Sequence, residues 1–103
     1  MTQKSQLLNL LVTLEQTLND QGLWQVEAPS DEALASQQPF AVDTLQPEQW
    51  LQWIFIPKMT YLCRSEAPLP RGFSVTPYFE QVWLEAPKPA VLKVLNQIDE
   101  VCR

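Results

Sequence analysis

The sequence predicts an all-α fold: a compact four-helix bundle with an additional short helical turn, in a single all-helical domain over residues 1–103. Three observations predict it. Four stretches carry apolar residues at helical spacing. Nine prolines against two glycines fall mostly at the expected helix boundaries. The 103 residues are 46% hydrophobic, enough to form one core.

The first helix is expected over residues 3–20. Its apolar stripe consists of Leu7, Leu11, Leu14 and Leu18, spaced by three or four residues. Gly22 then suits the left-handed position that closes a helix. The leucines are interpreted as core, and the alternative is a zipper that binds a partner.

The central helix is expected over Gln46–Arg64, and the other elements are placed around it. Pro47 suits the first turn of a helix, and Gln49 can reach back to a free N–H at that end. Asp43 or Thr44 is expected to share the N-cap. From Trp50 to Leu62 the stretch is apolar nearly all round, which indicates burial on several sides. A strand over 53–56 is the rival, disfavoured by the length of the pattern.

Pro57 lies inside the central helix and is expected to kink it, because proline lacks an N–H and crowds the carbonyl of Trp53. Two interpretations stay open. The kink wraps the helix round the core, or it opens a ligand cleft beside Trp53.

The remaining elements are shorter. A helical segment is expected over 31–36, and Phe40 in the following loop is expected to plug the bundle. Residues 65–74, rich in proline, are expected to form a loop. Thr76 is expected to cap a fourth helix, which carries Tyr78. A last apolar stripe begins near Val91.

The net charge is −5, and the seven Lys and Arg residues are scattered. Nucleic-acid binding needs clustered basic residues, so no direct contact with nucleic acid is expected. No apolar stretch is long enough for a membrane span, and no secretion signal is visible, so a soluble, cytoplasmic protein is expected.

The residues that usually carry chemistry are scarce. The chain has no histidine, and two glycines cannot form a phosphate-binding loop. The adjacent acids Asp31–Glu32 and Asp99–Glu100 are interpreted as solvated surface. Cys63 and Cys102 are interpreted as buried free thiols, with a disulfide between them as the alternative. No catalytic residue, metal site or cofactor is expected, and the chain is not expected to be an enzyme.

The run QPFAVDTLQPEQWLQWIFIPKM, followed by Leu69–Pro70, Gly72–Tyr78 and Glu80, resembles the YqcC-like family of small bacterial proteins of uncharacterised function. The similarity covers nearly the whole chain. It implies a small all-α four-helix bundle, and it brings no activity and no catalytic residues. In some bacteria the gene of this family lies beside that of a tRNA pseudouridine synthase, which implies a role near RNA modification.

Two function classes remain. The first is a protein-interaction or accessory module with an unidentified protein partner, because exposed aromatic residues near arginine are typical interface anchors. The second is a binding protein for a small apolar ligand, with a pocket near the Pro57 kink. Asp43 is interpreted as a cap or a binding carboxylate, and Arg71 as solvated or a partner contact. The candidate interaction or pocket residues are Phe40, Asp43, Trp50, Trp53, Pro57, Tyr61, Arg71 and Tyr78.

Overall fold

The computed structural model describes residues 2–103 and confirms the all-α prediction, because none of these residues lies in a strand. Four helical segments of substantial length are joined by loops that carry shorter turns. In chain order the elements are α1 (Gln3–Asp20), α2 (Asp31–Leu34), the 3₁₀ turn η1 (Pro39–Ala41), α3 (Pro47–Trp50), the π turn η2 (Leu51–Phe55), α4 (Ile56–Arg64), α5 (Thr76–Val82) and α6 (Pro89–Val101).

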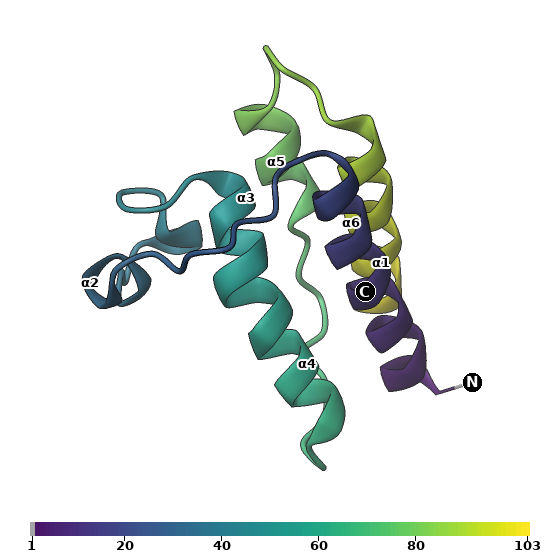
Figure 1. Ribbon diagram of the computed structural model, residues 1–103. Helices are drawn as coiled ribbons and strands as arrows, with labels where there is room; N and C mark the ends of the chain where they lie inside the picture. Colours follow the sequence, from purple (N-terminus) through teal and green to yellow (C-terminus); the bar gives the residue numbers. More distant parts are fainter. Residues whose placement is uncertain (1) are drawn as a thin grey trace.

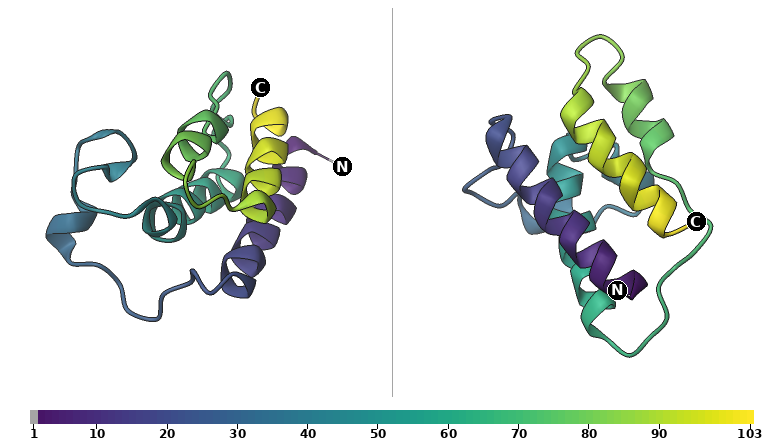
Figure 2. Two further views of the ribbon diagram at one scale, coloured as in Figure 1. Left: turned by 90° about the horizontal axis from the view of Figure 1, so that it is seen from above. Right: turned by 90° about the vertical axis from the view of Figure 1, so that its right-hand side faces the viewer.

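Helices α1 and α6 lie side by side and antiparallel, and the central helix α3–η2–α4 packs beside α1 (Figures 1 and 2). Helix α5 packs against α6. The segment that contains α2 and η1 extends to the side of the central helix away from α6 (Figure 1). The bundle is therefore closed on the side of α1 and α6, while mostly loops cover the rest of the central helix.

Helix α1 has the bounds and the core stripe that its pattern predicts. Leu7, Leu11, Leu14 and Leu18 are all buried. Gly22 follows with a φ of 72°, in the left-handed region that glycine enters without steric cost. The N–H groups of the residues around it satisfy carbonyls of the last turn, which closes the helix.

The central helix is continuous through Pro57, because a π turn precedes the proline. The N–H of Ile56 donates to the carbonyl of Leu51, five residues back rather than four. The residues that flank this turn, Trp50 and Ile56, have helical backbone angles. The predicted disturbance therefore takes the form of one widened turn, and α3, η2 and α4 form a single ribbon (Figure 1).

The prediction that the central helix is buried on several sides is wrong for its outer surface. Trp53 and Ile54 are half-buried, Pro57 is exposed, and Tyr61 is 72% exposed. The physical reason is that α1 and the core cover only one side of this helix. Gln52, in contrast, is only 4% exposed although it is polar.

The predicted cap of the central helix is only partly confirmed. The N–H of Gln46 donates to Oε1 of Gln49 (2.7 Å), as expected. Asp43 does not cap this helix, because its carboxylate accepts a hydrogen bond from the Ser36 hydroxyl (2.5 Å). Thr44 does not cap it either, and its hydroxyl donates to the carbonyl of Ala33 (2.8 Å).

Asp99 is not solvated surface, which corrects the prediction for the Asp99–Glu100 pair. It lies on α6, is 6% exposed, and its carboxylate caps the start of α5. The N–H groups of Val75 and Thr76 donate to its two oxygens at 2.9 and 3.0 Å. The hydroxyl of Thr76, which was expected to be the cap, instead donates to Asp99 (2.5 Å). The hydroxyl of Ser74 donates to the same carboxylate (3.3 Å).

Both cysteines are buried free thiols, as predicted. Burial raises the pKa of the Cys63 thiol. Burial, and then the charges of Asp99 and Cys63, raise the pKa of Cys102 to about 11. Both thiols are thus protonated at neutral pH, and they behave as core residues.

Among residues 2–103, no helix is both long enough and apolar enough to cross a membrane.

We predict that Asp99→Ala destabilises the protein by about 3 kcal/mol. The substitution leaves two buried backbone N–H groups and two hydroxyls without their acceptor, and each such buried donor costs about 1–3 kcal/mol. Urea denaturation of the variant beside the wild type measures the loss. The neighbouring Glu100→Ala is the control, and it should lie within about 0.5 kcal/mol of the wild type. A loss below about 1 kcal/mol for Asp99→Ala would contradict the cap.

We predict that Phe55→Ala and Trp53→Ala differ in cost. Phe55 is buried in the core, and truncating a buried aromatic costs about 3–5 kcal/mol. Trp53 is half-buried, so its loss should be about 1–2 kcal/mol, nearer to ordinary surface changes. Thermal and urea unfolding of the two variants decide this point. Equal losses would mean that the outer side of the central helix is packed after all.

Candidate functional site

The eight candidate residues do not form one site. Phe40, Trp50 and Tyr78 meet in an aromatic cluster on one side of the central helix. Trp53 and Pro57 line a groove on another side of the same helix. The remaining candidates, Asp43, Tyr61 and Arg71, line neither of these grooves and are exposed.

The first groove, here called the aromatic groove, lies between the central helix and the loop that follows it. Its volume is about 470 Å³. Nearly all of its lining is apolar. It is lined by Pro39, Phe40, Trp50, Ile54, Phe55, Lys58 and Met59 on one side and by Pro70, Phe73, Ser74 and Val75 on the other.

Stacked rings form one end of the aromatic groove. The Phe40 ring lies parallel to the Tyr78 ring, with their centroids 4.0 Å apart and their planes at 4°. The Trp50 ring is 4.8 Å from Phe40, and the Phe79 ring meets Phe40 edge-on at 5.9 Å. Such pairs stabilise a cluster by about 0.5–1.5 kcal/mol each beyond area burial. The cluster therefore holds Phe40 in place, as its predicted role in plugging the bundle requires.

The backbone at Phe40 and Ala41 is strained. Their φ angles are 57° and 48°, in the left-handed region that costs a non-glycine residue about 1–2 kcal/mol. Ala41 is only 2% exposed, and its carbonyl accepts from the N–H of Leu45 at 2.9 Å. Packing and hydrogen bonds thus stabilise an unfavourable conformation, a combination that is common at binding sites.

Few polar groups reach the aromatic groove. Lys58 is exposed at its edge and is the one charged side chain of the lining. Burial raises the pKa of the Tyr78 hydroxyl, which is therefore neutral at physiological pH. The lining holds no carboxylate and no thiol. The arrangement can bind an apolar group beside an anion, and it offers no general base.

The second groove, here called the proline groove, has a volume of about 550 Å³ and lies beside Pro57, where a ligand cleft was one of the two interpretations. Its lining combines apolar residues with glutamine and one acid: Glu15, Trp24, Gln25, Val26, Gln52, Trp53, Ile56 and Pro57. That this groove binds a ligand stays a prediction.

The buried Gln52 holds the loop at Gln25 against the central helix. Its side-chain oxygen accepts from the N–H of Gln25 (2.8 Å), and its side-chain nitrogen donates to the carbonyl of Gln25 (2.7 Å). Trp53 adds a bond from its indole N–H to the side chain of Gln25 (3.3 Å). The two bonds of Gln52 give both polar atoms of its buried amide a partner, so Gln52 has a structural role.

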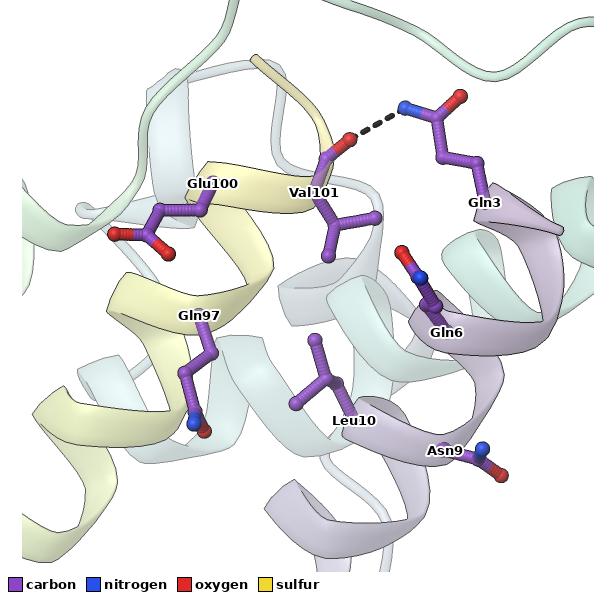
Figure 3. A pocket seen from close by; sticks show the side chains of 7 residues that line it. All are labelled: Gln3, Gln6, Asn9, Leu10, Gln97, Glu100 and Val101. Carbon is purple, nitrogen blue, oxygen red and sulfur yellow. Dashed lines mark hydrogen bonds between the residues drawn. The ribbon is translucent and has the colours of Figure 1, made fainter. Parts of the chain in front are cut away.

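A third, polar groove of about 550 Å³ lies between α1 and α6 near the chain ends. Figure 3 shows its lining, in which amide side chains surround Leu10 and Val101. The amide nitrogen of Gln3 donates to the carbonyl of Val101 and joins the two helices across this groove (Figure 3). Most of the polar side chains around it are exposed, so water competes for their hydrogen bonds.

Within residues 2–103, no three His, Cys, Asp or Glu side chains come together to hold a metal ion. Over the same residues, every buried side-chain nitrogen or oxygen has a hydrogen-bond partner. The buried polar groups are thus accounted for by the fold itself.

The capping role of Asp99 and the structural role of Gln52 are the two features that sequence reasoning missed. Asp99 lies four residues after Leu95 and three before Cys102, and this placement on the apolar helix face was the available signal. Gln52 carried a weaker signal, a polar residue inside a run that is otherwise apolar.

Comparison with known proteins identifies a family and several relatives. A family model described as "tRNA pseudouridine synthase C" matches residues 6–101. An uncharacterised protein of Haemophilus influenzae is 41% identical over 75 residues, which cover 73% of this chain and 71% of that protein. The protein YqcC of Escherichia coli, also named as uncharacterised, is 35% identical over 91 residues, covering 88% and 83% of the two chains.

One relative is much longer than this chain. The tRNA pseudouridine synthase C of Pectobacterium carotovorum is 39% identical over 83 residues, which cover 81% of this chain but only 22% of that protein. The chain thus matches about a fifth of this relative's length.

The fold has a solved counterpart. The solution NMR structure of Escherichia coli YqcC superposes with a TM-score of 0.86 at 35% identity, covering 98% of this chain and 88% of the other. Sequence and structure therefore agree with the predicted resemblance, and the chain belongs to the family of YqcC, small all-α proteins whose family model is described as "tRNA pseudouridine synthase C".

Proposed function

We propose that this chain is an accessory protein that binds a tRNA pseudouridine synthase and acts with it, rather than a catalyst. One observation carries the proposal. A segment homologous to this chain makes up 22% of a longer protein named tRNA pseudouridine synthase C. The other four fifths of that protein leaves ample length for a catalytic domain.

Covalent linkage is informative about partners. Two domains in one chain meet at an effective concentration of about millimolar, so even a weak contact between them is populated. Where this chain and the synthase are separate proteins, the same contact has to form by association. The two proteins would then act together as one complex.

The chemistry of the chain favours an accessory role. Histidine, the commonest general base, is absent. The two thiols are buried, with raised pKa values, so neither is a nucleophile at neutral pH. Catalysis therefore belongs to the partner in this proposal.

The charge of the chain favours contact with the enzyme rather than with tRNA. The net charge is −5, and no Lys or Arg lies between Lys4 and Lys58. Such a surface repels a phosphate backbone, which proteins bind through clustered basic residues. A tRNA-binding enzyme, in contrast, carries basic surface that an acidic protein can approach favourably.

A second candidate function rests on the proline groove. Its volume of about 550 Å³ lies within the range of about 300–1,000 Å³ that is typical of small-molecule sites. This reading makes the chain a binding protein for a small apolar ligand. The acid Glu15 in its lining disfavours an anionic ligand.

We predict that the purified chain forms a one-to-one complex with the tRNA pseudouridine synthase C encoded in the same genome. Isothermal titration calorimetry should give a dissociation constant of about 1 μM or tighter, the strength expected of a specific contact between separate chains. Analytical ultracentrifugation of the mixture should show the complex as one species.

Two controls define this test. An unrelated pseudouridine synthase should not bind, and tRNA alone should bind no tighter than about 10⁻⁴ M, the range of non-specific contact. Absence of any complex with the synthase at about 100 μM of each protein would overturn the proposed function. A salt-sensitive micromolar complex with tRNA alone would replace it with direct RNA binding.

A further inference from the structure

The loop that forms one wall of the aromatic groove is tied to the rest of the fold by hydrogen bonds at three points. Near its start, the Lys4 ammonium donates to the carbonyl of Ser65 (2.6 Å). In its middle, the N–H of Gly72 donates to the carbonyl of Cys102 (2.9 Å). At its end, the carboxylate of Asp99 accepts the hydrogen bonds described above. A site built from such a loop loses little conformational freedom when a ligand binds.

At the other end of the aromatic groove, ring stacking stabilises a strained backbone. The left-handed backbone at Phe40 directs its ring against Tyr78 and beside Trp50. The cost of about 1–2 kcal/mol per residue is offset by these ring contacts and by the hydrogen bond to the Ala41 carbonyl, so Phe40 keeps a defined position at the groove.

The lining has a defined chemistry. Phe55, Met59 and Val75 are buried in its floor, and Ile54 and Phe73 are half-buried at its edges. These half-buried side chains are what a partner's apolar group would cover. Lys58 is the one charged side chain of this lining. It therefore favours an occupant that carries a negative charge near it.

Lys58 is unusual in its setting. It is the first basic residue after Lys4, and the span between them carries acids but no other cation. Arg64 and Arg71 follow it in the sequence; both are exposed, and neither lines the groove. An occupant with a carboxylate is thus favoured at this groove and disfavoured elsewhere on the acidic part of the chain.

We propose that the aromatic groove docks an amphipathic segment of the pseudouridine synthase, with its apolar side chains in the groove and a carboxylate beside Lys58. This inference rests on the proposed function. The volume of about 470 Å³ fits a few apolar side chains from one face of a helix, the helix-in-groove mode of recognition. The favourable charge pair sets the orientation of the segment.

The test uses two variants of the groove and two matched controls in the full chain. Ile54→Glu places a charge at the half-buried edge, and Lys58→Glu reverses the charge of the lining. Leu84→Glu makes the same apolar-to-acid change at a residue 69% exposed outside the groove. Lys93→Glu makes the same charge reversal on α6. Circular dichroism and thermal midpoints establish that all four variants fold.

Each variant is titrated against the synthase by calorimetry. The inference predicts that Ile54→Glu and Lys58→Glu each weaken binding about tenfold or more, as the loss of an interface anchor does. The two controls should bind within about threefold of the wild type, the effect expected of residues outside an interface.

The outcomes separate this inference from the proposed function. If the synthase binds the wild type and both groove variants equally, the groove is not the docking site, while the accessory function stands. If the synthase does not bind the wild type, both are overturned. A further arm titrates dodecanoate, an apolar chain with a carboxylate. Its binding to the wild type but not to Lys58→Glu, without any binding of the synthase, would assign the groove to a small molecule instead.

Discussion

Pro57 lies near the middle of the central helix, which has to accommodate it without breaking. In a regular α-helix its ring would press on the carbonyl four residues earlier, at a cost of about 3 kcal/mol or more. The π turn over Leu51–Phe55 gives this region a wider turn just before the proline. The helix then continues into α4, so one continuous element carries both grooves.

The π turn also keeps the core side of this helix aligned. Leu51, Phe55, Met59 and Cys63 are all buried, at a strict spacing of four residues. In a regular α-helix four residues turn about 400°, so such a series drifts by about 40° at each step. A turn that holds more residues reverses part of this drift. The core stripe therefore stays on one side, and Trp53 and Ile54 are left at the edges of separate grooves.

The sequence predicted most of the fold, because the helix signals are local. The leucines of α1, Pro47 at the start of α3 and the apolar stripe of α6 all lie where the pattern placed them. What could not be predicted depends on contacts distant in sequence. Asp99 caps a helix that begins 23 residues earlier, and its place on the apolar face of α6 indicates burial but does not identify this partner.

The candidate site was predicted in its composition but not in its arrangement. Phe40, Trp50 and Tyr78 were singled out from the sequence, and they do meet. Their meeting depends on the left-handed backbone at Phe40. The sequence did not predict this conformation, because neither glycine nor asparagine occupies the position. The four-residue spacing from Leu51 to Cys63 was visible in the sequence, and in retrospect it is the signal that could have predicted the π turn. The apolar run predicted burial around Tyr61 as well, because such a run gives no information on which side of the helix lacks a neighbour.

The central claim is that the helix contains one π turn before Pro57. This turn decides which side chains of the helix face the core and which line the two grooves. Scalar couplings across hydrogen bonds, measured by NMR on ¹³C,¹⁵N-labelled protein, test it directly, because they identify the acceptor of each N–H. The account predicts a coupling between the nitrogen of Ile56 and the carbonyl carbon of Leu51. A coupling from Ile56 to the carbonyl carbon of Gln52 instead would show a regular α-helix and contradict the account.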